Sequence, residues 1–487
     1  MTRHCARAVF VLLCVAGISL WAQGREENRV IYWAAADLRS AEMKELTPQA
    51  KAATNGVGSK TFMNLQTHKV MMAHREKPGV PTAQDRKGAV QAPMFEVDPL
   101  WPKPLPNHWV LGSLGGIAVD GQDHIWILNR GSRTLAPNFK QLEFNPPWAM
   151  CCASAPTVLE FDQAGNLLRH WGNNAGGPGY EWFDQEHGLA IDHKGNVWIG
   201  GGTGGDSHLL KFTKEGKFLM QVGKRNARLV SGGSADRAQE QPGDGRGRGP
   251  ARVYKANSLD MESFGRPAKL VVDPNTNEAF VADGYLNTRI VVMDADTGKF
   301  KRFWGAYGNK PDDNMFEKAS VTGDQSATLY DPKAPPAPQF RHAVHCVMVS
   351  KDDLVYVCDR QGDRIQVFTK EGKFLKEAFV ARETRDAGSV WDLAFSADPQ
   401  QTYLYVGDGE NELIHIVRRD TLEELTAFGD GGRQPGMFYG VHVIASDSKG
   451  NLYTAETYEG HRVQRFVYKG VGPVTKKYQG VLWPSAK

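Results

Sequence analysis

Short apolar strands separated by turns with glycine, aspartate or asparagine repeat along most of the chain. A typical unit begins with an apolar strand that ends in Asp or Ser, turns into a second apolar strand, and adds two more strands, the last after G-K-F or G-N-L. Runs of this length and composition are typical of β-strands. The first strands of the units begin near Gly115, His187, Ala268, His345, Trp391 and His442.

Six such units of about 40 residues, each with four short strands, predict an all-β, six-bladed β-propeller over residues 93–487. Closing the units into a ring removes the open sheet edges that a row of stacked repeats would leave. A strand from one end of the region, either around 94–97 or around 474–483, is expected to complete the ring. The pattern does not choose between the two.

The start of the chain has the order of an export signal over residues 1–23. Arg3 and Arg7 precede an apolar run, which then gives way to a polar stretch. The run is too short for a good membrane span, and Cys14 follows a leucine rather than the small residue typical of a lipid-anchor signal. We therefore expect a secreted or periplasmic protein.

Residues 24–92 form an N-terminal extension that does not follow the repeat. Part of it resembles the opening of a cupin domain, but the paired metal-binding motifs of that fold are absent. His68 and His74 are therefore interpreted as surface or packing residues.

Composition agrees with a turn-rich globular protein. The 487 residues include 52 glycines and 26 prolines, and 41% are hydrophobic, enough for a buried core. The net charge of +3, with both signs mixed along the sequence, favours neither a nucleic acid nor a membrane as partner. We expect a monomer.

Removal of the signal leaves four cysteines for an oxidising compartment: Cys151, Cys152, Cys346 and Cys358. Cys346 and Cys358 fall on neighbouring predicted strands and can form a disulfide, or else remain two small buried thiols. The pairing of Cys151 and Cys152 stays open.

Three histidines occupy one position of the repeat. His187, His345 and His442 each stand five residues before the Asp or Ser that closes the first strand of its unit. They belong to alternate units, and the innermost strands of a propeller line its channel, so the imidazoles should lie about 120° apart around the axis. Three such ligands with an open position are typical of catalytic zinc, although copper, iron and cobalt also accept them. The alternative is three unrelated packed histidines, and His342 remains a reserve ligand.

Side chains at the end of the second strand should face the same rim, because the first two strands of a blade are antiparallel. Arg130 and Arg360 each stand ten residues after the end of a first strand, and Tyr285 lies just past the same place in the third unit. Arginines suit a substrate carboxylate or carbonyl, and a tyrosine beside a metal can act as a base. Taken singly, the arginines could instead form surface ion pairs, and Tyr285 could be a turn aromatic.

At these residues the sequence resembles the NHL-repeat propellers, most closely the catalytic domain of peptidyl-α-hydroxyglycine α-amidating lyase. EHGLAID, AVHCVMVS and GVHVIAS stand where that family has its zinc-binding histidines, ADGYLNTRIV where it has its catalytic tyrosine, and LNRGS and CDRQGDRIQ where it has two active-site arginines. The resemblance implies metal ligands His187, His345 and His442 and catalytic residues Tyr285, Arg130 and Arg360.

The resemblance also implies a function. The family cleaves an N-acyl-α-hydroxyglycine into an amide and glyoxylate, so a peptide or small-molecule substrate is expected, made by a separate hydroxylating monooxygenase. Val443 stands where the family has an aspartate involved in a calcium site, which argues against calcium here.

Two rival functions use the same fold. A non-catalytic propeller would bind peptides or glycans through rim loops, such as the basic glycine-rich loop around Arg246 and Arg248. A lactonase-like hydrolase would need a calcium site of carboxylates and asparagine, and the three channel histidines argue against it.

Overall fold

The computed structural model describes residues 90–173, 175–230, 253–314, 330–474 and 477–484. All of them belong to one compact unit, Pro81–Lys487. The predicted signal, His68, His74 and the loop around Arg246 and Arg248 lie outside the described residues.

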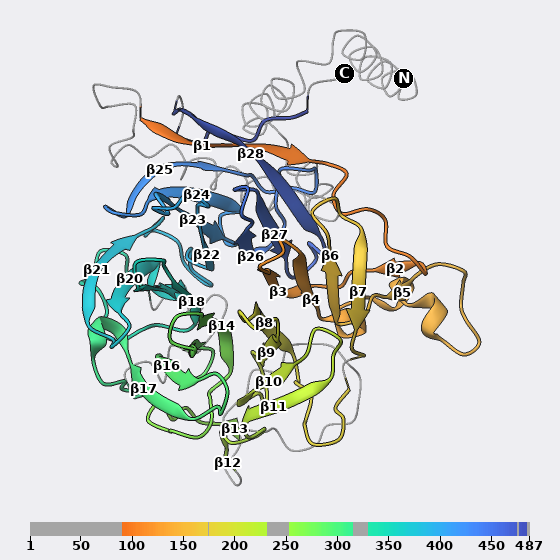
Figure 1. Ribbon diagram of the computed structural model, residues 1–487, viewed down its shortest axis with the longest axis horizontal. Helices are drawn as coiled ribbons and strands as arrows, with labels where there is room; N and C mark the ends of the chain where they lie inside the picture. The colour runs from red at the N-terminus through yellow and green to blue at the C-terminus, as the bar shows by residue number, and fades with distance from the viewer. Residues whose placement is uncertain (1–89, 174, 231–252, 315–329, 475–476, 485–487) are drawn as a thin grey trace, which may run out of the picture. The chain divides into compact units, whose positions relative to one another are not determined.

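The described residues form six four-stranded antiparallel sheets arranged around a common axis (Figure 1). This confirms the predicted all-β, six-bladed propeller. From the axis outward, blade 1 consists of β3 (Leu114–Val119), β4 (Ile125–Asn129), β6 (Val158–Phe161) and β7 (Leu167–Trp171); blade 2 of β8 (Glu186–Ile191), β9 (Val197–Gly201), β10 (His208–Phe212) and β11 (Phe218–Gly223); blade 3 of β14 (Pro267–Asp273), β15 (Glu278–Asp283), β16 (Arg289–Asp294) and β17 (Phe300–Trp304); blade 4 of β18 (Val344–Val349), β19 (Leu354–Asp359), β20 (Arg364–Thr369) and β21 (Phe374–Phe379); blade 5 of β22 (Asp392–Phe395), β23 (Tyr403–Asp408), β24 (Leu413–Arg418) and β25 (Glu423–Phe428); and blade 6 of β26 (Val441–Ser446), β27 (Leu452–Glu456), β28 (Val463–Pro473) and β1 (Gln91–Asp98).

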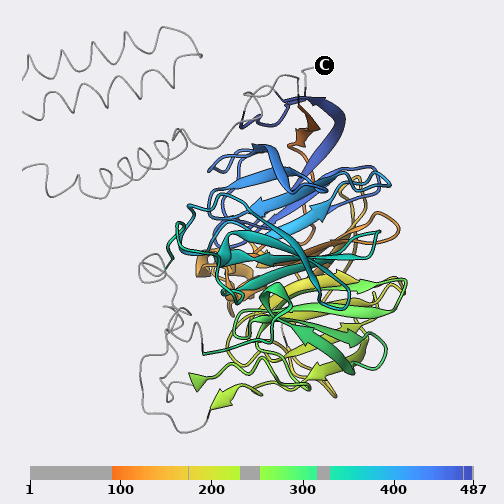
Figure 2. The same ribbon diagram turned by 90° about the vertical axis from the view of Figure 1, so that its left-hand side faces the viewer.

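Smaller elements lie between and within the blades, whose sheets are seen from the side in Figure 2. They are the parallel pair β2 (Trp109–Val110) and β5 (Ala153–Ser154), the antiparallel pair β12 (Leu229–Val230) and β13 (Val253–Tyr254), and the 3₁₀ turns η2 (Gly131–Arg133), η3 (Pro137–Phe139), η4 (Gln141–Glu143), η5 (Ala306–Gly308) and η6 (Arg360–Gly362). In the part of the chain that the structure describes, no helix is long and apolar enough to cross a membrane.

The ring is closed by the N-terminal strand. β1, which contains residues 94–97, pairs antiparallel with β28 as the outermost strand of blade 6. The other candidate segment runs beside it, because Tyr478 and Leu482 form single parallel bridges with Ala427 and Glu96. Both ends of the repeat region therefore contribute, the first as the fourth strand.

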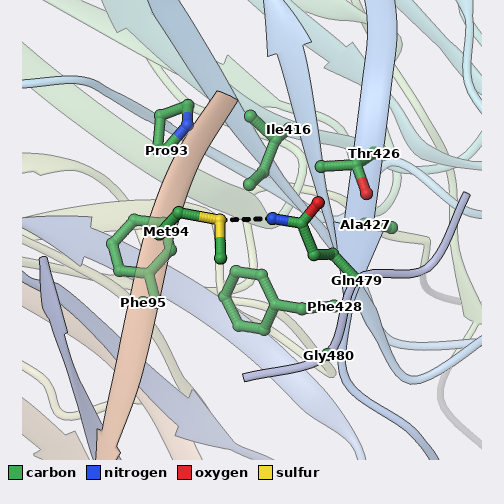
Figure 3. A pocket seen from close by; sticks show the side chains of 9 residues that line it. All are labelled: Pro93, Met94, Phe95, Ile416, Thr426, Ala427, Phe428, Gln479 and Gly480. Atoms are coloured by element: carbon green, nitrogen blue, oxygen red, sulfur yellow. Dashed lines mark hydrogen bonds between the residues drawn. The ribbon is translucent and has the colours of Figure 1, made fainter. Parts of the chain in front are cut away.

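Apolar packing and polar contacts together hold β1 to its neighbours. The ring centroids of Phe95 and Phe428 lie 5.4 Å apart, and the Gln479 amide donates a hydrogen bond to the sulfur of Met94 (Figure 3). Packing of this kind holds the two ends of the propeller together.

The aspartate that follows the first strand of a blade fixes the turn into the second strand. Asp192 accepts the backbone N–H groups of Lys194 and Asn196 at 3.0 and 2.8 Å, which fixes the turn into β9. Its second oxygen accepts the indole N–H of Trp198 at 3.1 Å. The same link joins Asp120 to Trp126 and Asp447 to Tyr453.

The hydrophobic core lies between neighbouring blades. Trp126 of blade 1 and Leu189 and Ile199 of blade 2 belong to one buried cluster, and each neighbouring pair of blades shares a similar one. Burying a side chain such as Leu189 stabilises the fold by about 1.5–3 kcal/mol. These interfaces fix the positions of the six inner strands around the axis.

Candidate metal centre

Three histidines from alternate blades meet at the axis. His187 lies in β8, His345 in β18 and His442 in β26, and all three side chains are buried. Their ring centroids lie 5.0, 4.8 and 5.2 Å apart. The structure thus brings together the three histidines that share one position of the repeat.

β-bulges help to direct these side chains towards the axis. In β18 and β26 the pairing register skips His345 and His442 themselves, and in β8 it skips Gly188, next to His187. A bulge leaves one residue outside the ladder and changes the direction of its side chain, a device common beside functional sites.

Each imidazole is held by the next blade through its Nδ1 atom. The hydrogen bonds join His187 to the carbonyl oxygen of Ala268 at 2.7 Å, His345 to that of Trp391 at 2.5 Å and His442 to that of Leu114 at 2.8 Å. Because a carbonyl can only accept, Nδ1 carries the proton and the lone pair of a neutral ring lies on Nε2.

Burial keeps the rings neutral. It is the largest cause that lowers the pKa of all three histidines well below the ordinary value. The cationic Arg360 lowers all three pKa values further, and neighbouring histidines add to the shift for His187 and His345. Neutral imidazole is the form that binds metal ions.

The donor set fits a transition metal. The three histidines offer ring nitrogens that all lie within 4.8 Å of one another, and the Nε2 atoms of His187 and His442 are 3.1 Å apart. Tetrahedral zinc with bonds of about 2.0–2.1 Å places its ligand nitrogens roughly 3.4 Å apart. The triad can therefore bind zinc or another metal that accepts imidazole.

Tyr285 lies directly over the triad, in the loop between β15 and β16. Its hydroxyl oxygen is 2.9 Å from the Nε2 atoms of both His187 and His345. Gly284 allows this approach, because a Cβ at that position would lie 2.2 Å from the backbone nitrogen of Val344. The structure thus brings the predicted tyrosine to the predicted ligands.

Arg360 reaches the same point from blade 4. It begins η6, is 8% exposed and donates a hydrogen bond from Nη1 to the Tyr285 hydroxyl at 3.1 Å. Its Cζ atom lies 4.8 Å from the ring centroid of Trp391, whereas its buried Nε has no partner among the described residues. Buried Arg289 and Arg364, in contrast, pair with Asp283 and Asp359.

Arg130 approaches from blade 1, and no carboxylate among the described residues forms an ion pair with it. Its Nε donates to the carbonyl of Glu186 and its Nη1 to the hydroxyl of Thr457, both at 2.9 Å. A Cβ on Gly115 would lie 2.5 Å from that carbonyl oxygen and 3.2 Å from Nε, so glycine at the blade 1 position leaves room for the arginine. Burial lowers the pKa of Arg130, the mark of a desolvated cation.

Sequence reasoning missed two further side chains near this group. Tyr458 and Glu410 each stand two residues past the acidic residue that ends the second strand, the place of Tyr285 in its own blade. Tyr458 is 56% exposed, with its ring centroid 6.3 Å from that of Trp391. Desolvation, helped by neighbouring carboxylates, raises the pKa of Glu410 to about 7. Aligning the strand ends across the blades would have found both.

Several predicted residues lie outside the centre. His342 is half-buried, and its Nδ1 lies 3.4 Å from the carbonyl oxygen of Gly284. Val443 is 4% exposed and packs in the apolar cluster that contains Leu114 and Tyr453, so it offers no oxygen for calcium.

The cysteines form two disulfides. Cys346 and Cys358 face each other across β18 and β19 and are joined, which links the strand of His345 to the strand that leads to Arg360. Cys151 is joined to its neighbour Cys152.

A second group of possible ligands consists of Asp120, His124 and Glu160. The Nδ1 atom of His124 already lies 2.8 Å from a Glu160 oxygen, and Arg169 pairs with the other oxygen of that carboxylate. These side chains satisfy one another as an ion-pair network.

Comparison with known proteins finds similar chains among the α-amidating enzymes. The chain is 26% identical over 361 residues to peptidyl-glycine alpha-amidating monooxygenase A of Xenopus laevis, a match that covers 72% of this chain and 31% of that protein. It is 24% identical over 392 residues to peptidyl-alpha-hydroxyglycine alpha-amidating lyase 1 of Drosophila melanogaster, covering 76% and 59%. The chain resembles the α-amidating lyases. It spans about a third of the length of the Xenopus relative.

Other comparisons extend or limit this likeness. NHL repeat-containing protein 3 of Mus musculus is 22% identical over 347 residues, covering 69% of this chain and 71% of that protein. A streptogramin B lyase structure covers 78% of this chain and 98% of its own, with a TM-score of 0.43 and 11% identity. No protein-family model matches the chain.

Proposed function

We propose that this protein is an exported, metal-dependent lyase that cleaves N-acyl-α-hydroxyglycine compounds into an amide and glyoxylate. The observation that carries the proposal is the meeting of the His187 and His345 Nε2 atoms, the Tyr285 hydroxyl and the Arg360 guanidinium within hydrogen-bond distance. The likeness to an α-amidating lyase supports the same reaction.

The two arginines suit the substrate carboxylate. Arg130 and Arg360 are buried, and neither forms an ion pair among the described residues. A buried cation without a counter-ion favours an incoming anion, and the unpartnered Nε of Arg360 offers it a donor. Binding would fix the α-carbon beside the triad.

Tyr285 is positioned to move the proton. In the proposed step Tyr285 first gives its own proton to solvent, and its oxygen then takes the proton of the α-hydroxyl. The C–O bond becomes a carbonyl, and the C–N bond breaks with its electron pair on nitrogen. Tyr285 then returns the proton to nitrogen, which gives the amide and glyoxylate. The hydrogen bond from Arg360 holds the phenolic oxygen in place beside the triad.

Zinc or a similar ion held by His187, His345 and His442 would supply Lewis-acid polarisation of a substrate oxygen. The protein's part is to present three neutral nitrogens in fixed directions, which the carbonyl acceptors on the neighbouring blades achieve.

Export and substrate supply complete the proposal. The two disulfides fit an oxidising compartment, in agreement with the signal predicted over residues 1–23. A hydroxylating monooxygenase would make the α-hydroxyglycine compound.

The experiment is an assay of glyoxylate release from α-hydroxyhippuric acid by the zinc-loaded protein, with Tyr285→Phe as control. Release that requires Tyr285 supports the proposal. No release by a protein that holds one equivalent of zinc would contradict it and favour the binding propeller.

A further inference from the structure

One buried ion pair joins blades that are not neighbours. Lys269 in β14 of blade 3 binds Asp392 in β22 of blade 5, with 2.5 Å between Nζ and Oδ1. The other carboxylate oxygen accepts the backbone N–H of Ile444, in β26 of blade 6, at 2.9 Å. Asp392 is fully buried and Lys269 is 9% exposed. These contacts thus link the inner strands of blades 3, 5 and 6, although blade 4 lies between blades 3 and 5 in the ring.

The ion pair is adjacent in sequence to the groups that hold the triad. Lys269 follows Ala268, whose carbonyl accepts the Nδ1 proton of His187, and Asp392 follows Trp391, whose carbonyl accepts that of His345. Ile444 lies two residues after His442 in the same strand. One carboxylate therefore connects the backbone beside both acceptors to the strand of the third ligand.

Stability alone does not explain such a pair. Two charges removed from water cost desolvation, and apolar residues of similar size are often equally stabilising or more so. The cost is visible in Asp392, because burial raises the pKa of this carboxyl while the Lys269 ammonium opposes the shift. A directional contact between strands, which apolar side chains cannot supply, is what the pair adds.

We propose that the Lys269–Asp392 ion pair is a positioning device for the metal centre. It holds the Ala268 and Trp391 carbonyls in place, and so sets the directions of the His187 and His345 Nε2 lone pairs. The inference rests on the proposed function only in requiring that the triad binds a metal. Partners outside the ligand sphere that orient metal-binding histidines typically change metal affinity about 10- to 100-fold when removed.

The test measures zinc affinity by chelator competition and records the visible spectrum of the cobalt-loaded protein. The variants are Asp392→Asn, Lys269→Met and the double variant Lys269→Met/Asp392→Leu. The double variant buries no unpaired charge, so it can be measured even if a single variant fails to fold. Lys211→Met is the matched control, because Lys211 in β10 forms a buried ion pair with Asp192, which directly follows β8 of the same blade. Neither residue of that pair neighbours an acceptor of a histidine.

The proposal predicts zinc binding about 10- to 100-fold weaker in the folded variants at the ion pair, with a changed cobalt spectrum, and an affinity within about twofold of wild type in the control. Wild-type affinity and spectrum in Asp392→Asn, or in the double variant, would overturn it. If the wild-type protein itself binds no metal, the metal centre fails, and the positioning role fails with it.

Discussion

The hydroxyl oxygen of Tyr285 lies 2.9 Å from Nε2 of His187, although 98 residues separate them in the chain. His187 lies in the inner strand of blade 2, and Tyr285 lies just past the second strand of blade 3. This contact places a proton carrier beside the nitrogen that would bind the metal.

Replacing Tyr285 with Phe removes the proposed proton carrier and keeps the ring. We expect the rate of glyoxylate release to fall about 10²- to 10⁴-fold, the usual contribution of general acid–base catalysis. Zinc content should stay unchanged, because the ligands are the histidines. A variant that retains wild-type turnover would remove Tyr285 from the mechanism.

Replacing Arg360 with Met should weaken substrate binding through the carboxylate. A charge-assisted hydrogen bond is worth about 1.5–3 kcal/mol, so KM should rise roughly 10- to 100-fold. A substrate whose carboxylate is replaced by a carboxamide should lose this sensitivity to Arg360. Equal losses for both substrates would mean that Arg360 acts elsewhere.

The same substitution should cost little stability. Arg360 forms no ion pair among the described residues, whereas the buried Arg364 pairs with Asp359 at 2.7 Å. Losing one partner of a buried pair typically costs about 3–5 kcal/mol. In urea unfolding we therefore expect Arg364→Met to lose about that much and Arg360→Met to lose less than about 1 kcal/mol or to gain. The reverse order would show that Arg360 is a structural residue.

His415 gives a pH-dependent contribution to stability away from the site. It lies 3.0 Å from both Asp408 and Glu424, and these carboxylates raise its pKa to about 10 against the opposing effect of burial. The folded pKa exceeds the unfolded value, so the stabilisation is complete below about pH 6.5 and is lost as pH rises towards 10. His415→Gln should therefore lower the free energy of unfolding at pH 6, by about 3–5 kcal/mol, and by much less at pH 10. A loss that does not depend on pH would mean that His415 is neutral in the folded protein.

The sequence predicted what the repeat determines. Each of His187, His345 and His442 has a fixed distance to the end of its strand, and blade geometry converts that distance into a place at the axis. Arg130 and Tyr285 followed from the antiparallel return of the second strand. The same register holds Tyr458 and Glu410, and only an alignment of the strand ends of all six blades predicts these two side chains.

Other features depend on which side chain stands at a given position, and the repeat does not set this. Lys269 and Asp392 are 123 residues apart and each follows the histidine position of its unit, in blades 3 and 5. The repeat therefore places both near the axis, but only the closed ring shows that these two side chains pair. The closing strand was also undecided, because segments at both ends of the repeat region are apolar enough to pair, and each one does form bridges.

The central claim is that the three axial histidines hold a catalytic metal. The most direct test is the metal content of the mature protein, purified without a histidine tag, beside a variant in which His187, His345 and His442 are all changed to Ala. The account predicts about one equivalent of zinc or another transition metal in the wild-type protein, and none in a variant that keeps its β-sheet circular dichroism. No metal in the wild-type protein, even after reconstitution, would contradict it.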